Sequence, residues 1–319
     1  MRLVSAEGSL LEEILDFTYP VWNEGLSRTA YAQWNKAQLR TRWGRQHLAR
    51  VALVDAAGRL LATAKRYRFD ARVDGRDGLV SGLAAVFTPP DLRGQGYATT
   101  LLERMIEEEQ RAGALAAALF SEIGPEFYAR LGFATVPLDE VTVNVELKGG
   151  SPAMLVRAGD DRDLADVATM EQARIANARF ALRRDAPLIQ YSIAKKRMQA
   201  GLGPPGARQI EFFVAEEGAS AVAYVVLSVS PQGWTLEAAG DRDPAAARLG
   251  AMLQVLAARE PTRQLPLIRT WWPRSFTVPP QWRLTDRGDS RDLLMVRPFI
   301  ELSRPLTADD VFYWRGDYF

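Results

Sequence analysis

The sequence has 319 residues, enough for about two domains of roughly 150 residues each, and it contains no cysteine and one histidine. These counts exclude disulfides and a cysteine nucleophile, and they leave no ligand set for a thiolate or multi-histidine metal site, so we expect no metal. Forty basic residues against 39 acidic ones give a formal net charge of +1, which argues against nucleic-acid and membrane-surface partners. Neither a signal-peptide pattern nor a membrane-spanning apolar run is evident, so we expect a cytoplasmic protein.

The first half alternates between strand and helix patterns. A hairpin is predicted around the turn Ala56-Ala57-Gly58, and a strongly amphipathic helix carries Leu101, Leu102, Met105 and Ile106 on one face. In chain order we predict strands at 2–5, 49–55, 59–69, 79–88, 115–121 and 141–147, and helices at 9–17, about 28–43, 98–112 and 125–131.

The second half repeats this order after a predicted linker at residues 148–152, Lys-Gly-Gly-Ser-Pro. We predict strands at 154–157, 210–215, 219–229 and 234–240, and helices at 160–178, 187–200 and 244–258. The pattern indicates an α/β chain with a mixed central sheet flanked by helices, duplicated in tandem. The expected domains are 1–150, which carries the active site, and 151–300, followed by a tail at 301–319.

The most informative segment joins a predicted strand to a helix. It reads Val86-Phe87-Thr88-Pro89-Pro90-Asp91-Leu92-Arg93-Gly94-Gln95-Gly96-Tyr97-Ala98. Free N–H groups at a helix N-terminus attract phosphate, and Gly94 and Gly96 allow a close approach and positive φ angles. By itself, this pattern fits a plain strand–helix turn as well as it fits a pyrophosphate site.

A second segment, one helix and one strand later, narrows the interpretation. It reads Phe120-Ser121-Glu122-Ile123-Gly124-Pro125-Glu126-Phe127-Tyr128-Ala129-Arg130-Leu131-Gly132-Phe133. Together the two segments resemble the GNAT acetyltransferase superfamily. Its cofactor motif, Gln/Arg-x-x-Gly-x-Gly/Ala, is matched by Arg93, Gly96 and Ala98. Its Phe-Tyr-x-x-x-Gly-Phe element is matched by Phe127, Tyr128, Gly132 and Phe133. The resemblance covers about residues 1–147.

This resemblance implies an acetyl-CoA site in the first half. In the superfamily the strand before the glycine turn splays from its neighbour, so the backbone of Val86, Phe87 and Thr88 should bind the pantetheine arm and the thioester carbonyl. A backbone N–H aimed at that carbonyl would stabilise the oxyanion that develops in acyl transfer. The pyrophosphate should be held by the amides of Arg93, Gly94, Gln95, Gly96, Tyr97 and Ala98. Ser121 and Glu122 should border the other side of the splay.

The resemblance also suggests proton-transfer residues. Tyr128 matches the tyrosine that in many members protonates the departing thiolate; the alternative is a core aromatic. Glu122 is a candidate base by its position, and His47 is a weaker one. Two tandem units and a chain ending in Phe319 are similar to the enhanced-intracellular-survival acetyltransferases, in which the C-terminal carboxylate is the base. The alternative is that the aromatic tail, residues 311–319, packs for stability.

Other features bear on the acceptor and on the second half. The Phe-Ser-Glu-Ile-Gly-Pro run also looks like fungal-type lysine acetyltransferases, which suggests a small cationic amine. The acceptor pocket is expected near Trp22, Asn23, Glu24, Tyr31 and Trp34. In the second half the turn reads Gly240-Asp241-Arg242-Asp243-Pro244, whose aspartates would repel a pyrophosphate. Trp271, Trp272 and Trp282 suit packing better than a cation site.

We therefore expect an acetyl-CoA-dependent N-acetyltransferase acting on a small or lysine-like primary amine, with a degenerate GNAT-like second half. A non-catalytic acyl-CoA sensor is the main alternative. A nucleotide-phosphate binder is disfavoured because no Gly-Lys-Ser/Thr follows the turn. A homo-oligomer is left open.

Overall fold

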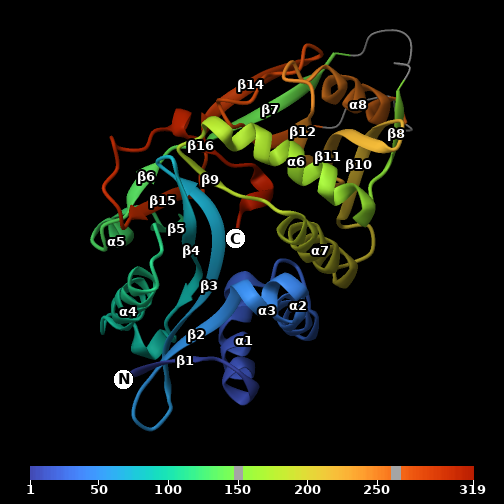
Figure 1. Cartoon of the computed structure of the whole chain (residues 1–319). Helices are drawn as coiled ribbons and strands as arrows, with labels where there is room; N and C mark the ends of the chain where they lie inside the picture. Colours follow the sequence, from blue (N-terminus) through green and yellow to red (C-terminus); the bar gives the residue numbers. More distant parts are fainter. Residues whose placement is uncertain (147–153, 260–266) are drawn as a thin grey trace. The chain divides into compact units, whose positions relative to one another are not determined.

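The computed structural model describes residues 1–146, 154–259 and 267–319 (Figure 1). The described chain forms two compact units, each built from more than one stretch of sequence. Unit 1 contains residues 1–136, 291–305 and Phe319, and unit 2 contains residues 137–290 and 306–318. The predicted linker at 148–152 lies outside the described residues. No helix in the described part of the chain is long and apolar enough to span a bilayer.

Unit 1 is a sheet with helices on its faces, and its strand order is β1-β2-β3-β4-β5-β15-β6. The strands β4 and β5 run parallel, and their neighbours pair antiparallel. Its elements are β1 (Arg2–Ser5), α1 (Gly8–Trp22), α2 (Arg28–Arg40), α3 (Arg42–His47), β2 (Leu48–Val54), β3 (Leu60–Val73), β4 (Arg76–Phe87), η1 (Pro90–Leu92), α4 (Tyr97–Arg111), β5 (Ala116–Ser121), α5 (Glu126–Ala129), β6 (Ala134–Val136) and β15 (Leu293–Pro298).

Helix α4 buries the apolar stripe that its sequence predicts. Leu101, Leu102 and Met105 are fully buried and pack in one cluster with Leu83 of β4 and Leu119 of β5. Burying a side chain of this size stabilises a fold by roughly 1.5–3 kcal/mol. The packing therefore fixes the N-terminus of α4 at the end of β4, where the glycine turn lies.

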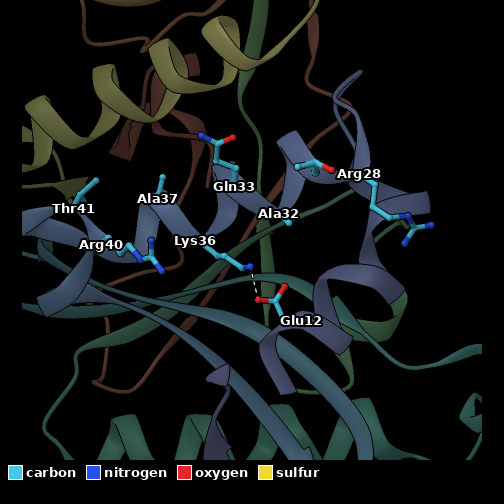
Figure 2. A pocket seen from close by; sticks show the side chains of 9 residues that line it. Glu12, Arg28, Ala32, Gln33, Lys36, Ala37, Arg40 and Thr41 are labelled. Atoms are coloured by element: carbon cyan, nitrogen blue, oxygen red, sulfur yellow. Dashed lines mark ion pairs between the residues drawn. The ribbon is translucent and has the colours of Figure 1, made fainter. Parts of the chain in front are cut away.

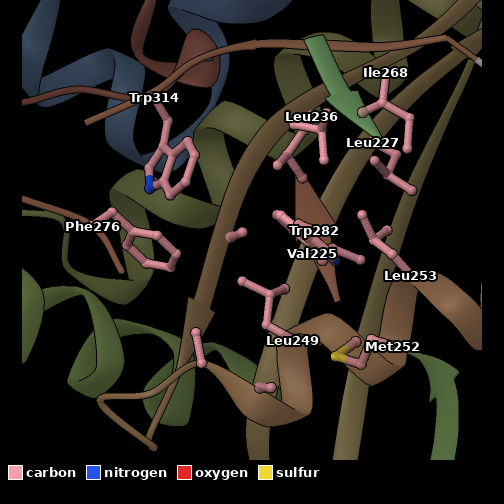
Figure 3. Close-up of a cluster of buried hydrophobic side chains, with 14 of the residues drawn as sticks. Val225, Leu227, Leu236, Leu249, Met252, Leu253, Ile268, Phe276, Trp282 and Trp314 are labelled. Atoms are coloured by element: carbon pink, nitrogen blue, oxygen red, sulfur yellow. The ribbon is translucent and has the colours of Figure 1, made fainter. Parts of the chain in front are cut away.

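Unit 2 is a second sheet, with the order β14-β7-β13-β12-β11-β10-β8. Its elements are β7 (Asp139–Val145), β8 (Leu155–Ala158), η2 (Asp161–Asp163), α6 (Leu164–Arg174), η3 (Ile175–Asn177), β9 (Phe180–Leu182), α7 (Ala186–Leu202), β10 (Gln209–Glu217), β11 (Ser220–Ser230), β12 (Gly233–Asp241), α8 (Ala247–Ala258), β13 (Ile268–Trp271), β14 (Trp282–Asp289), η4 (Ala308–Asp310), β16 (Val311–Phe312) and η5 (Arg315–Asp317). Figure 3 shows part of its core, a buried cluster that includes Leu249 and Met252 of α8 together with Val225, Trp282 and Trp314.

The two sheets have the same plan. In each, a short strand is followed by a hairpin, a fourth strand, a helix and a fifth strand parallel to the fourth: β4-α4-β5 in unit 1 and β12-α8-β13 in unit 2. The next position in each sheet is filled by a strand from elsewhere in the sequence. β15 pairs with β5 and β6, whereas β7 pairs with β13 and β14.

Most predicted elements are confirmed within a few residues, and both hairpins form, β2–β3 and β10–β11. Two predicted helices are corrected. The segment predicted as one helix at about 28–43 divides into α2 and α3, because Thr41 is extended and its hydroxyl caps α3 through the Gly44 amide. The helix predicted at 160–178 is α6 flanked by the short turns η2 and η3. Trp272 and Trp282 lie in the core, which confirms the packing interpretation for these two residues.

Candidate active site

The end of β4 carries an irregularity that separates it from a regular strand. Ala84 pairs with Lys65 and Phe87 pairs with Thr63, so β4 has one more residue than β3 across this interval. Ala85 adopts φ 47°, a left-handed conformation that is uncommon for a residue with a side chain. This bulge redirects the backbone at Val86, and sequence patterning gave no sign of it.

The two central strands of unit 1 stop pairing before they end. The β4–β5 register runs from Val80 opposite Ala116 to Leu83 opposite Leu119. Beyond Leu83, no described residue of β5 is registered against β4, although β4 continues to Phe87 and β5 continues to Ser121. The main chain around Val86–Thr88 thus has one edge without a strand partner in the described residues, the arrangement expected of a splay.

The turn between β4 and α4 presents a run of amides. Gly94 and Gly96 adopt φ of 76° and 79°, with open space where a Cβ would lie. Among the described residues, none accepts a hydrogen bond from the amides of residues 94–99, and the first amide to find an acceptor is that of Thr100, which donates to the Gly96 carbonyl at 3.0 Å. N–H groups without acceptors at the start of a 15-residue helix have the direction and the helix dipole that suit an anion.

The side chains of this turn differ in their contacts and their exposure to solvent. Arg93 donates to the Thr88 carbonyl at 3.3 Å and lies 5.9 Å from the Phe87 ring, so its guanidinium lies over the end of β4. Gln95 is exposed, and Tyr97 and Ala98 are half-buried. Contacts of Arg93 thus join the glycine turn to the end of β4, so the predicted cofactor-binding residues 86–98 lie close together.

Tyr128 is buried on α5, between the rings of Phe127 and Phe133. Burial raises the pKa of Tyr128 to about 12, and the negative charge of Glu122 adds to the increase. Glu122 itself is exposed. The structure thus brings these two predicted residues together and keeps the phenol protonated at neutral pH.

Ser121 uses its hydroxyl inside the loop that follows β5. It donates to the Gly124 carbonyl at 2.6 Å, and the residue is 1% exposed. Gly124 has φ 88°, a conformation that favours glycine, so this pair fixes the turn that leads into α5. Through the turn, Ser121 positions the segment that carries Tyr128.

Phe319 packs its ring against the sheet of unit 1. Its centroid lies 5.4 Å from that of Tyr67, 5.1 Å from Phe69 and 5.2 Å from Phe120. A Cβ on Gly82 would approach the Phe319 ring to 2.9 Å, so the glycine makes room for it. Because Gly82 pairs with Ala118 just before the splay, Phe319 lies at the point where β4 and β5 part.

The residues expected at the acceptor pocket have varied environments. Tyr31 is 3% exposed, and its hydroxyl shares a hydrogen bond of 2.9 Å with Thr18. Trp22 lies 6.2 Å from Phe87, and the Lys65 ammonium lies 5.5 Å from the Trp34 ring. Asn23 accepts from the Gly25 amide, and Glu24 has φ 54°, in the tight turn that ends α1.

His47 at the end of α3 and Arg50 in β2 pack against the same sheet. His47 stacks on Trp43 at 4.8 Å, and its Nδ1 lies 3.1 Å from the Arg68 carbonyl, contacts that hold the end of α3 on the sheet. Arg50 was not singled out from the sequence, yet it is 3% exposed, and burial lowers its pKa to about 10. Its position as the one charged residue in an apolar strand pattern was the available signal.

The matching turn of unit 2 is occupied by its own side chains. One Asp241 oxygen accepts from the Leu249 amide of α8 at 3.0 Å, and the other accepts from the Asp243 amide at 2.8 Å. The pairing of β12 with β13 covers only Trp234 and Thr235, and beyond it Gly316 packs on the main chain of Glu237. In unit 2, Asp241 thus occupies the place equivalent to the glycine turn, and Gly316 lies beside the place equivalent to the splay.

Most of the first part of unit 1 is similar to a known protein family. Residues 10–136 match the model of a family described as an acetyltransferase (GNAT) domain. This segment is therefore similar to GNAT acetyltransferase domains. The match includes the glycine turn, β5 and the Phe-Tyr element, and it confirms the predicted enzyme class. No curated protein matches the sequence.

Solved structures share the GNAT fold over almost the whole chain. A conserved protein of unknown function from Enterococcus faecalis V583, a probable N-acyltransferase, is 12% identical with a TM-score of 0.69, covering 93% of this chain and 72% of its own. A GCN5-related N-acetyltransferase from Kribbella flavida is 17% identical with a TM-score of 0.65, covering 93% and 70%. Saccharomyces cerevisiae N-myristoyltransferase with bound myristoyl-CoA is 11% identical with a TM-score of 0.57, covering 96% and 80%. At these identities the likeness shows the fold.

Proposed function

We propose that unit 1 transfers an acetyl group from acetyl-CoA to a primary amine. The observation that carries this proposal is the run of amides at residues 94–99 without acceptors, placed at the end of a strand that has parted from its parallel neighbour. An anion site next to an open strand edge fits a long cosubstrate with a pyrophosphate at one end and a thioester at the other. The GNAT family match supports the same assignment.

The chain's own groups would divide the binding between them. The amides of residues 94–98 would hold the pyrophosphate, and the unpaired edge at Val86, Phe87 and Thr88 would bind the pantetheine arm and the thioester carbonyl. The Arg93 amide is already used, since it donates to the Pro90 carbonyl at 3.4 Å. The bulge at Ala85 supports this division because it turns the strand out of register just before those residues. Ser121 would contribute by fixing the loop on the opposite strand.

The reaction is a direct attack. The amine nitrogen forms a bond to the carbonyl carbon, the carbon–sulfur bond breaks, and the sulfur takes a proton while the nitrogen loses one. We assign the proton donor to Tyr128, since its pKa of about 12 keeps it protonated at neutral pH and it lies on α5, which follows β5, the strand that parts from β4. Transfer to a thiolate, whose ordinary pKa is about 8–9, then depends on that thiolate being held in a poorly solvated site.

The base has two candidates. Glu122 is exposed beside Tyr128, so it could take a proton from an incoming amine and release it to water. The carboxylate of Phe319 is the second candidate, and its support is that the Phe319 ring packs at the start of the splay. A residue added after Phe319 would move the carboxylate and keep the ring, which separates these two candidates.

Unit 2 is proposed as a duplicated GNAT-like fold without its own acyl-CoA site. The shared strand order supports duplication, and the Asp241 cap on α8 supports the loss of phosphate binding. The narrower likeness to enhanced-intracellular-survival and fungal-type lysine acetyltransferases remains a prediction, and a lysine-like amine is the acceptor it suggests.

The test is acetyl-CoA turnover, followed by thiol release, against lysine, polyamines, aminoglycosides and peptides. Release that depends on one amine class establishes the transferase. Tight acetyl-CoA binding without release for any amine would instead favour the sensor function. Absence of binding would refute the assignment of residues 93–98.

A further inference from the structure

A broad groove runs along the outer face of α2 in unit 1. Its volume is about 820 Å³, and Figure 2 shows basic side chains along its length and the Lys36–Glu12 ion pair within it. The residues that line it are Glu12, Arg28, Thr29, Ala32, Gln33, Lys36, Ala37, Arg40 and Thr41. The residues of α2 that face the sheet, Tyr31, Asn35 and Gln38, are buried, so the groove lies on the opposite side of the helix.

The segment that supplies most of the groove's lining, residues 25–54, is free of acidic residues. From Gly25 to Val54 there is no aspartate or glutamate, whereas six arginines and lysines occur: Arg28, Lys36, Arg40, Arg42, Arg45 and Arg50. The whole chain has a net charge of only +1, so this segment departs sharply from the average. Five of the six side chains lie on α2 and α3, and Arg50 is buried in β2.

The charges along the groove are not equally available. Arg28 pairs with Asp16 at 2.8 Å, and Lys36 pairs with Glu12, so one end is partly neutralised. Arg40 lines the groove, and Arg42 and Arg45 follow just beyond its end on α3. All three are exposed, and none has an ion-pair partner among the described residues. An unneutralised cationic cluster therefore lies where α2 passes into α3.

We propose that this groove binds an acidic polypeptide segment. Arg28 and Arg40 are 12 residues apart on one helix, about 18 Å at 1.5 Å per residue, which suits an extended chain better than a compact anion. Ala32 and Ala37 also line the groove, and Thr29 and Gln33 supply hydrogen-bonding groups along it. Two of the groove's cations already have carboxylate partners, so its remaining charge fits a few spaced carboxylates better than the dense phosphates of nucleic acid.

The test is binding of a fluorescein-labelled peptide of eight glutamates to the full chain, measured by anisotropy at low and at physiological salt. Its blocked N-terminus offers no amine, so docking is measured independently of the proposed acetyl transfer. We expect binding that weakens about tenfold or more with salt, and no binding of the equivalent glutamine peptide. The double variant Arg40→Glu/Arg45→Glu should lose at least tenfold in affinity.

The matched control is Arg76→Glu/Arg130→Glu, which changes the net charge equally through two exposed arginines of unit 1 outside the groove. It should bind the peptide within about twofold of the unaltered chain. Equal losses in both variants, or no binding of the glutamate peptide, would overturn the proposal. Tighter binding of an eight-nucleotide single strand would also overturn it, since the surface would then be a nucleic-acid site.

Discussion

The Asp241 carboxylate accepts a hydrogen bond from the Leu249 amide of α8 at 3.0 Å. At the start of the corresponding helix of unit 1, α4, the amides of residues 94–99 have no acceptor among the described residues. A carboxylate at a helix N-terminus satisfies donors that would otherwise be available to an anion. The same strand and helix order thus has open amides at the helix start in unit 1 and an internal carboxylate cap in unit 2.

Replacing Asp241 tests the internal cap. Asp241→Ala should lower the free energy of unfolding by about 1–2 kcal/mol, since it removes acceptors from the Leu249 and Asp243 amides. Urea unfolding measures the change. Acetyl-CoA affinity should stay the same. Binding of a second acetyl-CoA molecule per chain by the variant would contradict a permanently closed site in unit 2.

The glycine turn can be tested with a control on the same helix. Gly96→Ala forces a side chain into φ 79° beside the free amides, so we expect at least tenfold weaker acetyl-CoA binding in calorimetry. Gly113, just past the other end of α4, has φ 82° and equally open surroundings. Gly113→Ala should cost similar stability and leave the affinity unchanged. Equal affinities for both variants would remove the turn from the binding site.

Tyr128→Phe should keep acetyl-CoA affinity and lower kcat by about 10²-fold, the range expected for loss of a general acid. Unchanged turnover would contradict the assigned role. A difference titration at 295 nm against this variant should place the Tyr128 pKa near 12. Because the folded pKa exceeds the ordinary value of 10, Tyr128 leaves stability unaffected below pH 10 and lowers it as the pH rises from 10 to 12.

The buried cation Arg184 pairs with Glu171 and Asp317, and all three side chains are at most 8% exposed. Arg184→Leu leaves two carboxylates buried without it and should cost about 3–5 kcal/mol at pH 8. Burial already raises the pKa of Glu171 and of Asp317, and loss of the cation raises them further. The folded variant then binds more protons than the unfolded chain, so its deficit should shrink as the pH falls from 8 to 5. Urea midpoints across that range measure it; a constant deficit would contradict the coupling.

Phe319 can be probed by moving its carboxylate without removing its ring. Adding one glycine after Phe319 should reduce kcat at least tenfold if that carboxylate is the base, and Phe319→Ala should chiefly reduce stability, because its ring contacts Tyr67, Phe69 and Phe120. Glu122→Gln is the companion variant. A large effect of Glu122→Gln with none from the added glycine would assign the base to Glu122.

The sequence patterns predicted those features that depend on residues close together in the chain. The stripe Leu101, Leu102, Met105 indicated α4, and the turn at residues 56–58 indicated the first hairpin, because period and turn chemistry act over a few residues. The same logic located the free amides at Gly94 and Gly96. It could not indicate the bulge at Ala85, since an alanine with positive φ is imposed by the surrounding sheet and not by its own preference.

The sequence pattern also could not predict which of the two sheets a strand joins. The alternation at residues 141–147 predicted a strand, and β7 forms, but nothing in alternation states which sheet it joins. Its partners β13 and β14 lie more than 120 residues later, so the choice depends on long-range packing. The position of Phe319 on Gly82 is equally non-local.

The placement of β15 has a consequence for how the protein is made. Residues 293–298 fill the gap between β5 and β6, so the edges of both strands stay open until these residues have left the ribosome. At 5–20 residues per second, the roughly 160 residues between β6 and β15 take about 8–30 s to synthesise. During that interval the nascent first half exposes strand edges, which makes it a natural client for a chaperone. An isolated fragment ending at residue 136 should accordingly aggregate.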